Sequence, residues 1–228
     1  MTKLAHKLGL SPVLSFHDVF SLTEPSLIAM LPRPASALLF IYPHTELGEA
    51  YNDKEKASDK PYDGSGPDEP IIWYPQIIKN ACGLMGLLHC ITNSPAAELI
   101  QEGSDLDNFR KAIIPLKPKE RGQYVHDSDI LEKAHAAAAQ TGDSVAPALG
   151  EDPGHAFIAF VKGKDGHLYE LDGGRGGPVD RGVMKEDEDV LSDNALALGP
   201  LPYLKREEEA GNGVFNFSCT VLAPSIDG

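Results

Sequence analysis

The chain has 228 residues, of which 42% are hydrophobic and 24% are charged, and this composition is typical of a globular protein with a sizeable core. Its 20 Lys and Arg residues against 34 Asp and Glu residues give a formal net charge of −14. A surface this acidic repels phosphate backbones and anionic lipids, so we expect neither nucleic acid nor a membrane as partner, but a basic molecule.

The first residues and the cysteines indicate a reducing compartment. The start of the chain, Met1 to His6, lacks the apolar core of a secretory signal, and the longest apolar run, residues 35–42, is too short to span a bilayer. The three cysteines, Cys82, Cys90 and Cys219, include no Cys-x-x-Cys pair. We therefore expect reduced thiols in the cytoplasm or nucleus, with no disulfide framework, no structural zinc site and no cofactor.

The first part of the chain predicts two short helices, one strand and a long loop. Residues 1–10 favour a helix, and Thr23 to Leu31 favours another, with a Thr cap and a proline in its first turn. The apolar residues 35–42 favour a strand that is buried on both faces. Residues 45–70 are rich in Asp, Glu, Lys, Gly and Pro, which predicts an exposed loop.

The middle of the chain predicts three helices and a loop. Residues 80–93 are apolar nearly all round and begin with a good N-cap residue, Asn80, so we expect a buried central helix. Residues 104–113 and 120–139 predict two further helices. Residues 141–154 are rich in Gly, Pro and Ala and show no periodicity, which predicts a flexible loop.

The last part of the chain predicts strands. His155 to Val161 and His167 to Leu171 flank the turn-forming residues 162–166, which predicts a hairpin, and Val214 to Leu222 predicts another strand. This order of helices and strands is that of an α+β fold rather than of a regular βαβ repeat. Because the chain shows no internal repeat and no strong boundary, we expect residues 1–228 to form a single domain.

Cys82 is the strongest candidate for a nucleophile. It is predicted to be the second or third residue of the helix capped by Asn80, where the helix dipole and unpaired backbone N–H groups favour a thiolate over a thiol. Gly83 and Gly86 are expected to leave open space beside its sulfur. The alternative is that Cys82 is a small buried hydrophobe, which is the usual state of a free cysteine.

A thiolate nucleophile needs a base, and His155 is the best candidate among eight histidines. It opens a predicted strand, and Asp172 closes the returning strand. A two-residue turn at 163–164 would set His155 directly opposite Asp172, and a turn at 165–166 would leave both on one face. An odd-length turn or a bulge would separate them, and the two residues would then be only a strand end and a turn entry.

The other candidates for catalysis lie closer to Cys82 in sequence. His89 is seven residues further along the same predicted helix, a rise of about 10 Å, so it is better interpreted as a core histidine. Gln76 precedes Cys82 by six residues, and its side-chain amide could hold a tetrahedral oxyanion, although a solvated loop residue is the simpler interpretation. The four residues together, in the order Gln, Cys, His, Asp, are more informative than any one of them, and papain-like thiol hydrolases use the same catalytic logic.

The segments around these four residues resemble those of a known family. Gln76 to His89, with the letters QIIKNACGLMGLLH, resembles the active-site signature of ubiquitin C-terminal hydrolases. Gly154 to Phe160 and Gly166 to Gly173 resemble the His and Asp segments of that family, and Leu8-Gly-Leu10 and Leu31-Pro-Arg-Pro34 also match. The resemblance covers residues 8–222.

The resemblance implies a fold, a reaction and the role of each site residue. It implies a papain-like central antiparallel sheet wrapped by helices, with a knotted backbone and a crossover loop, here residues 140–154, above the active site. Small adducts and unfolded peptides are then the expected leaving groups. It implies that Cys82 is the nucleophile, His155 the general base and acid, Asp172 its orienting partner and Gln76 the oxyanion donor, in a monomer that binds ubiquitin or a ubiquitin-like protein.

The sequence departs from the family pattern in three places. Cys90 and Thr92 stand where the signature usually has Ala or Ser, and both are small. The family's extra N-terminal segment with a Trp, which helps to hold ubiquitin, is not expected here. Residues 151–154 lack the apolar side chains expected near the ubiquitin tail, so we assign no individual binding residue.

Three functions fit the four site residues. The first is thiol-dependent hydrolysis after the C-terminal glycine of ubiquitin or a ubiquitin-like protein, and we favour it. The second is a papain-like peptidase or acyltransferase with another substrate. The third is a module that binds ubiquitin with little or no turnover, because some thiol hydrolases rest in an unproductive geometry.

The first of these functions would supply the basic partner that the acidic net charge predicts, because the ubiquitin tail is rich in arginine. Three acidic clusters lie outside the catalytic segments, at residues 46–53, 186–189 and 207–209. They are candidates for steering a basic substrate, although solvated loops are the simpler interpretation of each.

Overall fold

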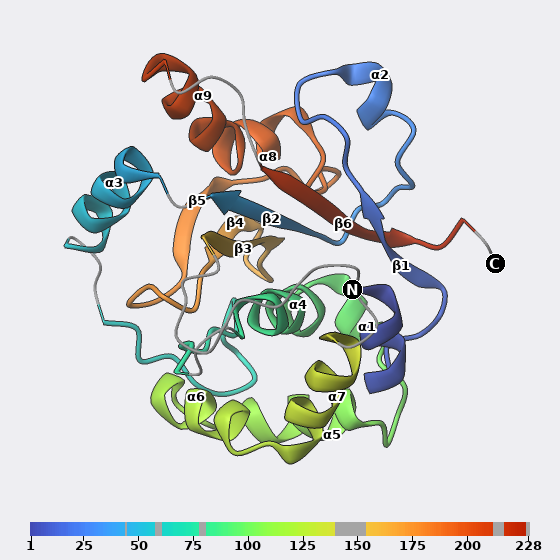
Figure 1. Ribbon diagram of the computed structural model, residues 1–228. Helices are drawn as coiled ribbons and strands as arrows, with labels where there is room; N and C mark the ends of the chain where they lie inside the picture. The colour runs from blue at the N-terminus through green and yellow to red at the C-terminus, as the bar shows by residue number, and fades with distance from the viewer. Residues whose placement is uncertain (44, 58–60, 78–80, 140–153, 212–216, 227–228) are drawn as a thin grey trace.

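The computed structural model describes residues 1–43, 45–57, 61–77, 81–139, 154–211 and 217–226, except the side chains of 135 and 137–139. Within these residues, six strands form one antiparallel sheet in the order β1-β6-β2-β3-β4-β5 (Figure 1). The strands are β1 (Leu14–Asp18), β2 (Ala37–Pro43), β3 (His155–Lys162), β4 (His167–Leu171), β5 (Val179–Val183) and β6 (Ser218–Pro224). The predicted α+β class with an antiparallel sheet is confirmed.

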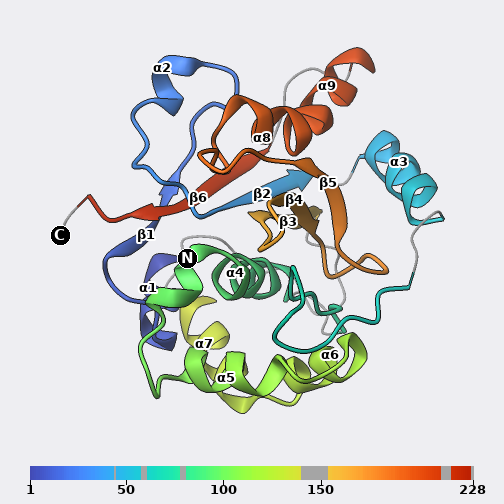
Figure 2. The same ribbon diagram turned by 180° about the vertical axis from the view of Figure 1, so that it is seen from behind.

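Helices cover both faces of the sheet. The helical elements are α1 (Thr2–Leu8), α2 (Pro25–Ile28), α3 (Glu46–Lys56), α4 (Cys82–Asn93), the 3₁₀ helix Pro95–Leu99, α5 (Asp105–Ile113), α6 (Pro118–His126), α7 (Asp129–Ala139), α8 (Asp193–Leu198) and α9 (Leu201–Glu209). Figures 1 and 2 show α1, α4, α5, α6 and α7 on one face and α2, α8 and α9 on the other. No helix in the described part of the chain is long and apolar enough to cross a bilayer.

β2 explains why the sheet carries a core on each face. Alternate side chains of a strand point to opposite faces. Ala37 and Leu39 accordingly belong to the core shared with α4, while Leu38 and Phe40 belong to the core shared with α8 and α9. All four are fully buried, so the prediction of a strand buried on both faces is confirmed.

The helix α3 corrects the prediction of a loop over residues 45–70. Thr45 caps this helix by accepting a hydrogen bond from the Gly48 N–H at 3.0 Å, and acidic residues in the first turn and lysines in the last turn complement the helix dipole. Glu55 helps to dock this helix through hydrogen bonds from arginines 175 and 181. The loop prediction from composition is therefore wrong for residues 46–56, because the cap and the two arginine partners stabilise a helix there.

Three other predicted elements differ in extent. The helix predicted over 120–139 is two helices, α6 and α7, because the Ser128 hydroxyl accepts from the Leu131 N–H and starts a new helix. The helix predicted over residues 23–31 is only the short α2. The strand predicted from residue 214 is β6, which begins at Ser218, and residues 212–216 lie outside the described residues. The predicted loop 141–154 and crossover 140–154 also lie outside them, apart from Gly154.

The hairpin of β3 and β4 has neither of the two turns predicted for it. Ala159 pairs with Leu171, and Gly163 donates to the His167 carbonyl at 2.8 Å across a three-residue turn. Gly166 takes a φ of +81° in this turn, a conformation that glycine adopts without strain. If this register continued, Asp172 would face Ile158 rather than His155, so the strand ladder does not pair the two candidate catalytic residues.

Candidate active site

Cys82 is the first residue of α4, one position nearer to the helix start than predicted. The N-cap is Ala81, with a φ of −101° and a ψ of 10°, and the predicted cap, Asn80, lies outside the described residues. The first N–H groups of a helix have no partner within it, and the positive end of the helix dipole lies among them. The half-buried thiol of Cys82 therefore lies at the positive end of the helix dipole, as the sequence predicts for a nucleophile.

The glycines beside Cys82 serve the packing of α4 on the sheet. A Cβ added at Gly86 would lie 2.5 Å from Leu39 Cδ1 in β2, and one added at Gly83 would lie 3.5 Å from Phe157 Cε1 in β3. Their faces are therefore occupied by the sheet, which corrects the expectation of open space beside the thiol. The contact with Phe157 also brings the Cys82 end of α4 to the start of β3.

His155 is the first residue of β3, two residues before Phe157, and it pairs with Pro43 at the end of β2. Its side chain is half-buried. Because Gly83 of α4 packs on Phe157, the chain segments that carry Cys82 and His155 lie next to each other.

Gln76 and Asp172 are likewise brought together by their backbones. The Gln76 N–H donates to the carbonyl of Gly173 at 2.8 Å. A Cβ on Gly173 would lie 2.8 Å from the Gln76 Cβ, so only glycine permits this close approach. Both Gln76 and Asp172 are half-buried. The structure thus joins Gln76 to the Asp172 segment and Cys82 to the His155 segment.

His89 is excluded as a base by its surroundings, as the sequence predicted. It is fully buried and stacks on Tyr74 with ring centroids 4.2 Å apart, and its Nε2 accepts the Tyr74 backbone N–H at 3.4 Å. Burial lowers the pKa of His89 to about 3. The ring therefore stays neutral in the core.

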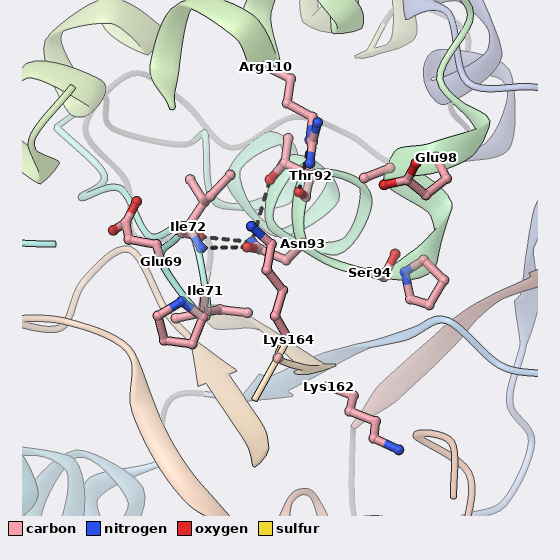
Figure 3. A pocket seen from close by; sticks show the side chains of 14 residues that line it. Glu69, Ile71, Ile72, Thr92, Asn93, Ser94, Glu98, Arg110, Lys162 and Lys164 are labelled. Carbon is pink, nitrogen blue, oxygen red and sulfur yellow. Dashed lines mark hydrogen bonds between the residues drawn. The ribbon is translucent and has the colours of Figure 1, made fainter. Parts of the chain in front are cut away.

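A pocket of about 250 Å³ lies at the other end of α4 (Figure 3). Asn93, the last residue of α4, lines it and uses its side chain to bind the Ile72 N–H at 2.6 Å and the Ile72 carbonyl at 2.8 Å. At about 1.5 Å of rise per residue, Asn93 lies roughly 16 Å along the axis from Cys82. None of the predicted site residues lines this pocket.

Comparison with known proteins identifies the family. The family model described as "Ubiquitin carboxyl-terminal hydrolase, family 1" matches residues 1–198. The chain belongs to this family. It is 33% identical over 230 residues to ubiquitin carboxyl-terminal hydrolase YUH1 of Saccharomyces cerevisiae, covering 98% of this chain and 92% of that protein. It is 33% identical over 222 residues to isozyme L1 of Sus scrofa, covering 97% and 93%.

A solved structure agrees with this family. The catalytic domain of Trichinella spiralis UCH37, bound to ubiquitin vinyl methyl ester, superposes with a TM-score of 0.70 at 20% identity and covers 98% of this chain and 90% of that one. At this identity the match shows the fold. Family membership makes the chain a thiol-dependent ubiquitin C-terminal hydrolase, a cysteine-type deubiquitinase, as the sequence resemblance implied.

Sequence reasoning missed one neighbour of the predicted site. The indole Nε1 of Trp73, three residues before Gln76, donates to the Asp172 carbonyl at 3.0 Å. The only signal for it was that a lone tryptophan precedes the ubiquitin C-terminal hydrolase signature. The two departures from that signature lie in the core, where Cys90 is buried and Thr92 donates to the Leu88 carbonyl at 2.8 Å.

Proposed function

We propose that Cys82, His155, Asp172 and Gln76 are the residues with which this chain hydrolyses the bond after the C-terminal glycine of ubiquitin. The observation that carries the proposal is the convergence of two pairs of segments. Cys82 begins a helix whose first turn packs on the start of β3, where His155 lies, and Gln76 is hydrogen-bonded to the residue after Asp172.

The proposed reaction passes through an acyl-enzyme. The Cys82 thiolate attacks the carbonyl carbon, and the Gln76 amide donates a hydrogen bond to the oxyanion that forms. His155 gives a proton to the leaving group, which departs and leaves a thioester on Cys82. His155 then takes a proton from water as the water attacks the thioester, the C–S bond breaks, and the C-terminal carboxylate of ubiquitin leaves while Cys82 returns to the thiolate. Asp172 keeps the imidazole oriented in both steps.

The partner and setting are part of the same proposal. The ubiquitin adduct of Trichinella spiralis UCH37 supports ubiquitin as the molecule that this chain binds. We propose further that small adducts and unfolded peptides are the preferred leaving groups and that neither nucleic acid nor a membrane is a partner. Residues 1–228 would then act as one monomeric catalytic domain in the cytoplasm or nucleus.

The test is hydrolysis of a fluorogenic ubiquitin amide by the full chain. We expect Cys82→Ala to abolish turnover, His155→Asn to lower kcat by at least about 1000-fold, and Gln76→Ala to lower it by about 100-fold. Cys90→Ala is the matched control, because it removes a core thiol, and it should keep the wild-type kcat. Retained turnover in Cys82→Ala would overturn the assignment.

A further inference from the structure

Asp172 is held by hydrogen bonds outside the strand ladder, and one of them comes from a tryptophan. Its carboxylate accepts the Gly174 backbone N–H at 2.8 Å. It follows the last residue of β4, and the observed register does not pair it with His155. Its backbone carbonyl accepts the Trp73 indole N–H at 3.0 Å and the Arg175 backbone N–H at 3.2 Å. The Trp73 bond comes from the segment that also carries Gln76.

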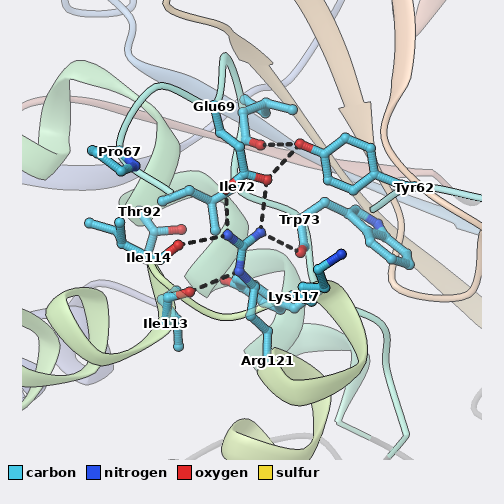
Figure 4. A network of polar contacts seen from close by, with 12 residues as sticks. Tyr62, Pro67, Glu69, Ile72, Trp73, Thr92, Ile113, Ile114, Lys117 and Arg121 are labelled. Atoms are coloured by element: carbon cyan, nitrogen blue, oxygen red, sulfur yellow. Dashed lines mark hydrogen bonds and ion pairs between the residues drawn. The ribbon is translucent and has the colours of Figure 1, made fainter. Parts of the chain in front are cut away.

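Trp73 is itself fixed at several points. Its exposed fraction is 3%, and its ring meets that of Tyr62 edge to face, with centroids 6.3 Å apart and an angle of 89°. Its backbone carbonyl accepts the Arg121 guanidinium at 3.3 Å (Figure 4). Three residues further on, the Gln76 N–H binds the Gly173 carbonyl at 2.8 Å. Two hydrogen bonds therefore connect residues 73–76 to residues 172–173.

Arg121 anchors this segment to the helices. It is fully buried in α6, forms an ion pair with Glu69, and donates to the carbonyls of Ile113 at 2.9 Å and Ile114 at 3.1 Å (Figure 4). Gly122, the next residue, lets α6 approach the segment, because a Cβ there would lie 2.8 Å from Pro75 Cγ. The chain of contacts runs from α6 through residues 73–76 to Asp172.

We propose that Trp73 is a positioning residue that sets the catalytic carboxylate, Asp172, through its indole hydrogen bond to the Asp172 carbonyl. Cys82 belongs to the helical face of the site and Asp172 to the sheet, so their relative position depends on contacts that cross between the two. The hydrogen bond of Trp73 is one of these contacts. The inference rests on the proposed role of Asp172.

The chemistry predicts a specific kinetic effect. Loss of the indole N–H leaves the Asp172 carbonyl with its bond from Arg175 and the carboxylate with its bond from Gly174, so the fold is kept. The backbone that carries the carboxylate loses one restraint. A misplaced carboxylate orients His155 poorly in the transition state, and this lowers kcat while leaving ground-state binding of ubiquitin unchanged. We expect Trp73→Phe to lower kcat by about tenfold and to change KM by less than about twofold.

The experiment is a double-mutant cycle on the full chain, with kcat and KM measured on a fluorogenic ubiquitin amide. The four proteins are wild type, Trp73→Phe, Asp172→Ala and the double variant. If Trp73 acts through the Asp172 side chain, Trp73→Phe changes kcat by less than about twofold in the Asp172→Ala background. Tyr74→Phe is the matched control, because it removes a buried hydroxyl from the next residue, whose ring stacks on His89, and we expect wild-type kcat.

A second variant keeps the test informative if Trp73→Phe does not fold. Because Trp73 is the only tryptophan in the chain, global replacement of tryptophan by benzothienylalanine exchanges its N–H for a sulfur and changes no other residue. This protein should show the same loss in kcat.

Two results would overturn the inference. One is a wild-type kcat for both Trp73 variants, and the other is an equal loss in the presence and absence of the Asp172 carboxylate, which would indicate a general structural role. Failure of the proposed function gives a different result from failure of the role of Trp73. In that case the wild-type protein would be inactive, or Cys82→Ala would be active, with any residue at position 73.

Discussion

At the scale of single residues, the three cysteines differ because of where each lies. Cys90 and Cys219 are buried in the two cores, and burial raises the pKa of both thiols. Cys82 is half-buried at the first residue of α4. The same side chain is therefore a core hydrophobe at two positions and a candidate nucleophile at the third.

This difference predicts selective alkylation. In the native protein at pH 7, iodoacetamide should modify Cys82 at least about tenfold faster than Cys90 or Cys219, because the reagent reacts with exposed thiolates. Peptide mapping by mass spectrometry measures the three rates. Cys82→Ala should leave the folded protein almost unlabelled, and labelling of all three thiols after denaturation is the control. Equal rates at Cys82 and Cys90 in the native protein would contradict the assignment.

At the scale of elements, α3 is docked by an ionic cluster. Glu55 accepts hydrogen bonds from Arg175 at 2.9 Å and from Arg181 at 3.0 and 3.1 Å. Burial alone would raise the pKa of Glu55, but the hydrogen bonds from the two arginines outweigh it and lower the pKa to about 2. The folded state therefore favours the ionised carboxylate.

The lowered pKa predicts a pH-dependent contribution to stability. The folded protein binds the Glu55 proton less readily than the unfolded chain, whose pKa is near 4.5. The contribution is complete above about pH 4.5 and is lost as the pH falls toward 2. Glu55→Gln should lower the free energy of unfolding by about 1–3 kcal/mol at pH 7. The difference from wild type, measured in urea at several pH values, should shrink in that window. A difference that is the same at pH 7 and pH 3 would contradict this account.

α6 depends on a second, deeper ion pair. Arg121 is fully buried and binds Glu69, which also accepts the Tyr62 hydroxyl at 2.7 Å (Figure 4). Arg121→Met leaves Glu69 as a buried charge and should lower the free energy of unfolding by about 3–5 kcal/mol.

The matched control for Arg121 is a surface pair at the start of the same helix. Lys117 and Asp63 lie 2.6 Å apart with 55% and 72% of their side chains exposed. Lys117→Met should cost less than about 1 kcal/mol, because exposed ion pairs contribute little. Equal losses for Arg121→Met and Lys117→Met in urea denaturation would show that burial of the pair does not matter.

At the scale of the whole molecule, the sequence predicted what local pattern controls. The apolar run of β2 and the buried helix α4 are visible because burial on all sides leaves a near-continuous apolar sequence. The turn after β3 was missed because a glycine in the left-handed conformation at Gly166 makes it three residues long. Trp73 was missed because its partner, the Asp172 carbonyl, is about 100 residues away and has no sequence signal.

The net charge of −14 is also a property of the whole molecule. The structure separates acidic groups that bind other residues of the fold from those that are exposed. Glu207 is buried and accepts the Tyr42 and Thr45 hydroxyls, and Asp189 binds Arg33, so these two acidic groups serve the fold. Glu186, Asp187, Glu208 and Glu209 are exposed. They remain candidates for attracting a basic substrate.

Steering by these groups predicts a salt effect on association. Added salt screens exposed charges, so kcat/KM for ubiquitin amide should fall by about threefold or more between roughly 50 and 500 mM salt, while kcat stays constant. A fluorogenic peptide with an uncharged tail is the control substrate, and its kcat/KM should not fall. A flat profile for ubiquitin would make the charge a matter of solubility alone.

Cys82 is proposed as the nucleophile of this ubiquitin C-terminal hydrolase. The most direct measurement is the reaction of the native chain with an electrophile placed at the C-terminus of ubiquitin, followed by mass spectrometry of the adduct and its peptides. We predict one ubiquitin per chain, attached at Cys82, and none on Cys82→Ala. Attachment at Cys90 or Cys219, or a full adduct on Cys82→Ala, would contradict the claim.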